Sequence, residues 1–130
     1  MPLFTVTMRA GRTAGEKTAI SRAIHHASIK AGYPDDDMFQ RFLCLDQADL
    51  KVDPNYPGLP KPRTEKMLMI EVLVSSGTDA STKRRLLAAL VEALGPVGTD
   101  PNDIMVFFAE IDRANSSFGG GQLALPVANR

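Results

Sequence analysis

The chain has 130 residues, 44% of them hydrophobic and 23% charged, which is the size and balance of one soluble globular domain. Fifteen basic residues offset fifteen acidic ones, so no excess charge indicates nucleic acid or an anionic membrane surface as a partner. A single cysteine, Cys44, excludes an internal disulfide, and no apolar run approaches the roughly 20 residues that span a bilayer. Because the N-terminus also lacks a signal-peptide pattern, we expect one cytoplasmic domain over residues 1–130.

Residues 2–46 are predicted to form a strand, a helix and a second strand. In residues 2–9, large apolar side chains occupy every second position, which is the period of a strand. A helix is expected to begin after Thr13, because Glu16 three residues later completes the pattern of a capping box. The apolar face of this helix has helical spacing and consists of Ile20, Ala23, Ile24 and Ala27. Residues 38–45 are predicted to form the second strand.

A proline-rich connection over residues 47–66 separates this unit from a second one over residues 67–110. The second unit has the same order, with a continuous apolar strand over residues 67–74, a helix and a further strand over residues 104–109. Thr78 or Asp79 is expected to cap the helix, whose predicted apolar face consists of Leu87, Leu90, Val91 and Leu94. The glycine-rich tail, residues 111–130, is expected to form a short hairpin.

The two units register with each other when the sequence is shifted by 66 residues, without a gap. The matched positions are turns, caps and helix faces: Gly11 and Gly77, Ala27 and Ala93, Gly32 and Gly98, Asp37 and Asp103, Phe42 and Phe108. The chain is therefore predicted to contain two tandem β-α-β units.

Two such units are expected to share a four-stranded sheet with both helices on one face, an α+β (α/β) architecture. Strands within a unit are then parallel and their crossover right-handed. The other face stays uncovered, and strands this apolar favour a homo-oligomer that packs these faces together. The same element order also fits a ferredoxin-like sandwich, whose sheet is antiparallel, so that alternative stays open at this stage.

Pro2 is the first candidate for chemistry. Removal of Met1 leaves a secondary amine on a rigid ring, and the reference pKa of an α-amino group is about 8. Burial lowers such a pKa, because desolvation disfavours the ammonium form. An amine tuned in this way suits a general base that moves a proton next to a carbonyl, or a nucleophile that forms an iminium. If Met1 stays in place, the Pro2 nitrogen is an amide and has no basicity.

Three stretches give the chain a family resemblance: Pro2-Leu3-Phe4 with Gly11-Arg12-Thr13, residues 32–40, and residues 115–121. Together with the repeat, they resemble the tautomerase superfamily, and the fused length and Ser-Phe-Gly tail are most similar to its malonate semialdehyde decarboxylase branch. The resemblance implies a homotrimer that needs no cofactor or metal. It also implies a small-molecule carbonyl substrate and catalysis by Pro2 and Asp37, with Phe118 as a wall of the pocket.

The chain departs from this branch where relatives hold a substrate carboxylate. Those relatives carry arginines just after the third strand, and residues 75–78 of this chain read Ser-Ser-Gly-Thr. A bidentate arginine–carboxylate pair has no equivalent in serine or threonine. The expected substrate-binding residues are therefore Ser76, Thr78, Asn115, Phe118 and Arg41, with Arg63 and Arg113 as further arginines that replace the missing ones.

These observations leave two functions open. The first is a cofactor-independent tautomerase-like enzyme, an isomerase with weak decarboxylase or hydratase (lyase) activity as an additional expectation. The second is a non-catalytic ligand-binding or oligomeric interaction protein on the same scaffold, which the lost arginines and a retained Met1 favour. His25 and His26 alone supply too few ligands for a metal site, so no metal is expected.

Overall fold

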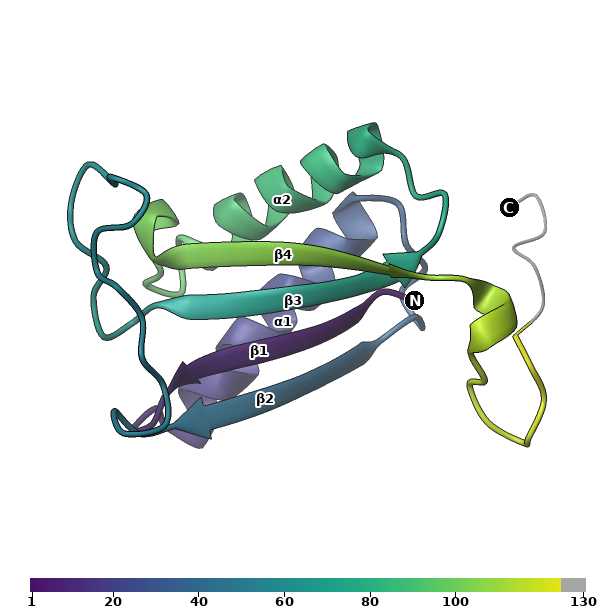
Figure 1. Ribbon diagram of the computed structural model, residues 1–130, viewed down its shortest axis with the longest axis horizontal. Helices are drawn as coiled ribbons and strands as arrows, with labels where there is room; N and C mark the ends of the chain where they lie inside the picture. The colour runs from purple at the N-terminus through teal and green to yellow at the C-terminus, as the bar shows by residue number, and fades with distance from the viewer. Residues whose placement is uncertain (125–130) are drawn as a thin grey trace.

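The computed structural model describes residues 1–124, and within this range the predicted order of two strand-helix-strand units is confirmed (Figure 1). The first unit contains β1 (Leu3–Arg9), α1 (Ala14–Lys30) and β2 (Phe39–Leu45). The second contains β3 (Leu68–Ser75), α2 (Ala80–Leu94) and β4 (Ile104–Ile111), with two short 3-10 helices, η1 (Pro101–Asp103) and η2 (Arg113–Asn115), before and after β4.

The four strands form one sheet in the order β2-β1-β3-β4. β1 pairs in parallel with β2, and β3 pairs in parallel with β4, while β1 and β3 run antiparallel at the centre. The two β-α-β units thus lie side by side in one sheet, as the repeat predicted, and the structure adds that they run in opposite directions. The parallel pairing within each unit excludes the ferredoxin-like alternative.

Both helices begin at side-chain caps that the sequence indicated. The Thr13 hydroxyl accepts a hydrogen bond from the Glu16 backbone at 3.1 Å, and the Glu16 carboxylate accepts one from the Thr13 backbone at 3.0 Å. This capping box lowers the pKa of Glu16 below its ordinary value. Of the two candidate caps for α2, Asp79 is the one used, and its carboxylate accepts from the Thr82 backbone at 2.7 Å.

The core lies between the helices and one face of the sheet, and both helices lie behind the sheet in Figure 1. The predicted face of α1 is confirmed, because all four of its apolar residues are buried. The predicted face of α2 needs correction: Leu87 is 40% exposed and Val91 is only half-buried, whereas Leu86 is buried. Leu86, Leu90 and Leu94 repeat every four residues and form one row, whereas Leu87 lies about 100° further around the helix.

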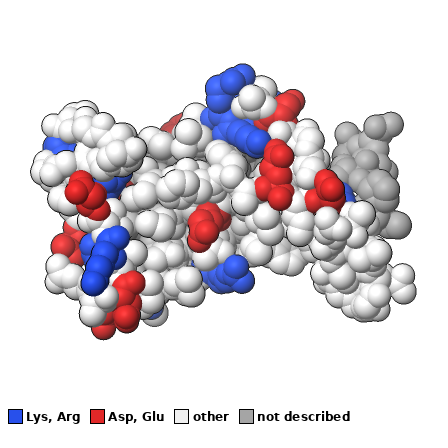
Figure 2. Space-filling model, viewed as in Figure 1, with Lys and Arg blue, Asp and Glu red and all other residues white. Residues whose placement is uncertain are grey.

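The other face of the sheet carries no helix. Figure 2 shows it as largely uncharged, with charged side chains gathered mainly toward the margins. Large apolar side chains stand exposed there, among them Phe39, Leu43 and Phe107 at 43%, 44% and 54% exposure. Within the described residues, no helix is both long and apolar enough to cross a membrane.

The segment after β4 turns away from the sheet (Figure 1). After η2, the chain makes a turn at Gly119–Gly121, where all three glycines have positive φ, and one backbone hydrogen bond from Ala124 to Ser116 closes the loop at 2.7 Å. No strand forms between residues 112 and 124, because consecutive positive φ angles take the backbone out of extended geometry. The remainder of the predicted hairpin, residues 125–130, lies outside the described residues.

Candidate active site

Four segments far apart in the sequence meet at one end of the sheet. Because β1 and β2 are parallel, the start of β1 lies beside the start of β2, where Leu3 pairs with Phe39. The antiparallel β3 brings its last residues to the same end, and Ser75 at that end pairs with Ile111 of β4. The N-terminus, the connection from α1 to β2, the end of β3 and η2 therefore converge.

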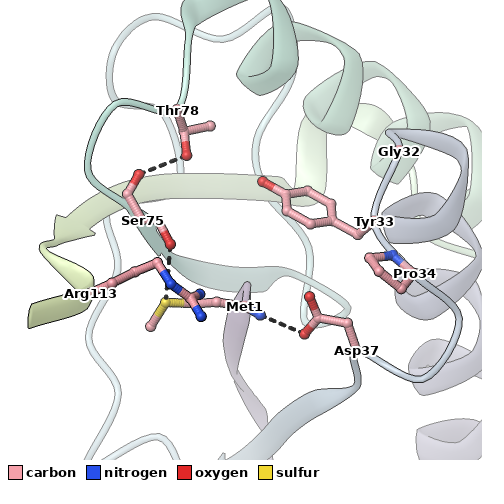
Figure 3. A pocket seen from close by; sticks show the side chains of 8 residues that line it. All are labelled: Met1, Gly32, Tyr33, Pro34, Asp37, Ser75, Thr78 and Arg113. Atoms are coloured by element: carbon pink, nitrogen blue, oxygen red, sulfur yellow. Dashed lines mark hydrogen bonds and ion pairs between the residues drawn. The ribbon is translucent and has the colours of Figure 1, made fainter. Parts of the chain in front are cut away.

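A cavity of about 230 Å³ opens among these segments (Figure 3). It is lined by Met1, Gly32, Tyr33, Pro34, Asp37, Ser75, Thr78 and Arg113. Figure 3 shows Met1 in the middle, with Asp37 on one side and Arg113 on the other. The cavity thus collects an N-terminal cation, a carboxylate, hydroxyl groups and a guanidinium.

The shortest polar contact in the cavity joins the chain terminus to Asp37. The ammonium nitrogen of Met1 lies 2.6 Å from Asp37 Oδ1, and the two side chains are only 6% and 11% exposed. Pro2 itself is buried. Consecutive backbone nitrogens are roughly 3 Å apart, so the Pro2 nitrogen lies within roughly 6 Å of the same carboxylate oxygen. The structure therefore brings Pro2 and Asp37 together at a buried place.

Tyr33 is a site residue to which the sequence reasoning gave no role. Its ring projects into the cavity from the α1–β2 connection (Figure 3). Burial raises the pKa of the Tyr33 phenol, the charge of Asp37 raises it further, and a hydrogen bond with Thr78 acts in the opposite direction. The signal that pointed to it was its position between Gly32 and Pro34, in a stretch that carried the family resemblance.

Thr78 and Ser75 supply the hydroxyl groups of the cavity. Thr78 Oγ1 donates to the backbone carbonyl of Ser75 at 2.7 Å, which holds its oxygen in place. Ser75 Oγ lies 3.9 Å from the sulfur of Met1. Of the predicted substrate-binding residues in this segment, Thr78 lines the cavity, whereas Ser76 is exposed and its neighbour Ser75 takes the lining position.

A second, shallower hollow of about 210 Å³ adjoins the first and shares Met1, Asp37 and Arg113 with it. Phe118 and Phe39 form its aromatic side, with ring centroids 5.8 Å apart. The Arg113 guanidinium lies over the Phe118 ring, 5.4 Å from its centroid, in cation–π geometry. Phe118 is therefore near the cavity as a wall of the neighbouring hollow.

The other candidates are not brought into the cavity. Arg41 lies on β2, where its Nε donates to Thr5 Oγ1 at 2.9 Å, and Arg63 donates to the backbone carbonyl of Asp53 at 2.7 Å. Asn115 is an exposed residue of η2. Arg113 is the arginine that lines the cavity. Among the described residues, no group of three or more His, Cys, Asp or Glu is arranged to hold a metal ion.

Comparisons with known proteins agree with this fold. A family model described as "Tautomerase enzyme" matches residues 37–119. A structure of FG41 malonate semialdehyde decarboxylase inhibited by 3-bromopropiolate is 28% identical, covers 93% of this chain and 92% of that chain, and has a TM-score of 0.85. Structures of malonate semialdehyde decarboxylase that address its decarboxylase and hydratase activities are 25% identical over 93% of both chains, also with a TM-score of 0.85.

A symmetric trimer, Q0 fused 4-OT, has the same fold, with 24% identity, coverage of 94% of this chain and 95% of that chain, and a TM-score of 0.75. No curated protein matches the sequence.

Proposed function

Because the chain belongs to the family of tautomerase enzymes, whose model spans residues 37–119, we propose that it moves a proton next to a carbonyl group without a cofactor, using the Pro2 amine. The observation that carries this proposal is the buried contact between the N-terminal ammonium and Asp37 at the wall of a cavity. Because the N-terminus lies beside the Asp37 carboxylate at the cavity wall, its amine is in position to contact a small substrate.

The proposed cycle begins once Met1 has been removed. The Pro2 nitrogen then carries the N-terminal amine, in a buried position near the carboxylate of Asp37. The unprotonated amine takes a proton from the carbon next to the substrate carbonyl, which leaves an enolate and a secondary ammonium. The ammonium returns the proton to oxygen or to another carbon, which completes the isomerisation and restores the amine.

Tyr33 is the group that we assign to the developing enolate oxygen, because the one hydroxyl proton of Thr78 is donated to the Ser75 carbonyl. Burial raises the pKa of Tyr33, so at neutral pH its phenol keeps the proton that it donates to this oxygen. A fixed donor aimed at developing charge stabilises the transition state more than the substrate. Asp37 holds the ammonium form of Pro2 in place, or orients a water molecule in a weak hydratase or decarboxylase reaction of the kind described for the 25% identical relative.

We also propose a homotrimer. The exposed apolar side chains on the open sheet face, Phe39, Leu43 and Phe107, favour burial against other copies of the chain. The structurally similar Q0 fused 4-OT is a symmetric trimer, and closed symmetry of this kind covers three identical faces at once.

The proposal is tested by proton exchange in a small 2-oxo acid, such as 2-oxobutanoate, in D₂O. The loss of its C3 proton signal is followed by NMR in the presence of the chain lacking Met1, the chain keeping Met1, and the variant Pro2→Ala. We expect catalysed exchange only with the first, slowed by about 10²- to 10⁴-fold in the others. Equal exchange rates for all three proteins would rule out the Pro2 amine as the base.

A non-catalytic binding protein is the second candidate, which a Met1 retained on the native protein would favour. In the structure the Met1 side chain lies in the cavity, and its amine takes the Asp37 contact. A mass measurement that finds Met1 on the protein from its own host, together with unchanged ligand binding in Pro2→Ala, supports this candidate instead.

A further inference from the structure

A second cavity, of about 250 Å³, is lined by residues of β1 and of the connection 46–67. This connection lies at the end of the sheet opposite to the N-terminus (Figure 1). The repeat relates the second cavity to the first cavity. Shifting the sequence by 66 residues carries Met1 onto Met67, and Met67 lines this second cavity. The same shift relates Arg9, which lines the second cavity, to Ser75, which lines the first.

The chemistry of this second cavity differs from that of the first. Met67 is inside the chain and offers no amine. Asp103, the counterpart of Asp37, is 3% exposed, and both of its oxygens are occupied by Thr64, one by the backbone N–H at 2.7 Å and one by the hydroxyl at 2.6 Å. The Asp103 carboxylate therefore holds the connection in place through Thr64.

Two arginine side chains line the second cavity. Arg9 stands where the first cavity has Ser75, and Arg63 of the connection lines the same space. One nitrogen of Arg9 donates to the Leu50 carbonyl, and one of Arg63 donates to the Asp53 carbonyl at 2.7 Å. Each guanidinium has five N–H donors in a planar fork, so these bonds leave donors for a further acceptor.

A buried donor of Arg9 has no hydrogen-bond partner. Its Nε is inaccessible and makes no hydrogen bond within the described residues. The Glu65 carboxylate forms an ion pair with this nitrogen at 3.6 Å, which is longer than a hydrogen bond, and the Glu65 side chain is 79% exposed. The Nε–H group is therefore paired by charge but makes no hydrogen bond, and a small anion that displaces the Glu65 carboxylate can supply one.

We propose that the second cavity binds a small oxyanion, a carboxylate or a phosphate group, between Arg9 and Arg63. Arginine forks recognise both groups through paired charge-assisted hydrogen bonds. The volume is below the roughly 300–1,000 Å³ of pockets for drug-sized molecules, so the ligand is small. Glu65 also lines the cavity, so an anion that binds there has to displace its exposed carboxylate from Arg9. The bound anion joins β1 to the connection and acts independently of the Pro2 chemistry.

The test is a titration of the full chain, labelled with ¹⁵N, with sodium phosphate and separately with sodium acetate at constant pH and ionic strength. The signal of the Arg9 Nε–H group is identified by its absence in Arg9→Lys. We expect this signal to shift in a saturable way with phosphate, acetate or both, and the comparison of the two arms identifies the preferred oxyanion.

Two variants and a matched control complete the test. Arg9→Lys and Arg63→Gln are expected to weaken binding by about tenfold or more, as loss of a charge-assisted hydrogen bond implies. The control is Arg12→Gln, because Arg12 is a neighbouring arginine that donates to the Lys66 carbonyl at 2.6 Å and does not line the cavity. It is expected to bind as the unchanged chain does.

Three results would overturn the proposal: no saturable shift with either anion, unchanged binding in Arg63→Gln, or an equal loss of binding in the Arg12→Gln control. If Arg9→Lys does not fold, Arg63→Gln decides, because Arg63 belongs to the connection and not to the sheet.

Discussion

Replacing Asp37 by asparagine in the chain that keeps Met1 removes the charge partner of the N-terminus and changes the side chain's size little. The two charged atoms are 2.6 Å apart and their side chains are 6% and 11% exposed. At an effective dielectric constant of about 20, their attraction is about 6 kcal/mol, and desolvation of both groups cancels most of it. Hydrogen bonds to charged groups contribute about 1.5–3 kcal/mol net. The asparagine keeps one acceptor, so we expect a loss of about 2 kcal/mol, or about 30-fold in the unfolding equilibrium.

The assay is urea unfolding followed by circular dichroism, at one fixed protein concentration because oligomers unfold in a concentration-dependent way. Intact mass confirms that Met1 is present. The matched control is Asp36→Asn, the same change at the exposed neighbouring aspartate, with an expected effect within about 0.5 kcal/mol. If Asp37→Asn and Asp36→Asn lose the same free energy of unfolding, the buried ion pair makes no special contribution and our reasoning about this contact is wrong.

Three further predictions follow from the caps, the cavity and the open face. Burial, and then the charge of Asp37, raise the pKa of Tyr33. The tyrosinate absorbance of Tyr33, taken as the difference between the unchanged chain and Tyr33→Phe, should therefore have its midpoint above about pH 10. Asp37→Asn should lower that midpoint, and a midpoint below about pH 10 in the unchanged chain contradicts the assignment. Because the folded-state value is the raised one, the stability linked to Tyr33 is fully present below about pH 10 and is lost as the pH rises through the folded-state value. Thr13→Ala should lower the free energy of unfolding by about 1 kcal/mol in urea, since it removes the capping box of α1, and no change would mean that the cap is redundant. Phe107→Glu should dissociate the proposed homotrimer in sedimentation experiments, because it puts a charge on the open face; an unchanged sedimentation coefficient would contradict an interface at this face.

Local rules and the repeat were enough to predict most of the fold. The capping box at Thr13 and the four apolar positions of α1 follow from spacing alone, and the structure has both. The face of α2 did not follow in the same way. Its sequence offers two apolar rows, one through Leu86 and one through Leu87, and only the position of the sheet decides which row is buried.

The candidate site was predictable where topology brings its residues together. Pro2 and Asp37 precede parallel strands of one unit, so pairing of those strands places them at one end of the sheet. Tyr33 was given no role from the sequence, and Arg113 was one of three candidate arginines between which the sequence did not decide. Their roles depend on how the α1–β2 connection and η2 fold over that end, and such irregular segments leave no periodic pattern in the sequence.

The central claim, that a buried amine at Pro2 performs the chemistry, is tested most directly by trapping. The chain without Met1 is incubated with a small aldehyde and borohydride, digested, and analysed by mass spectrometry. An iminium formed at Pro2 and reduced in place should add the mass of the alkyl group to the N-terminal peptide. Labelling confined to lysine residues, with an unmodified N-terminal peptide, would contradict the account.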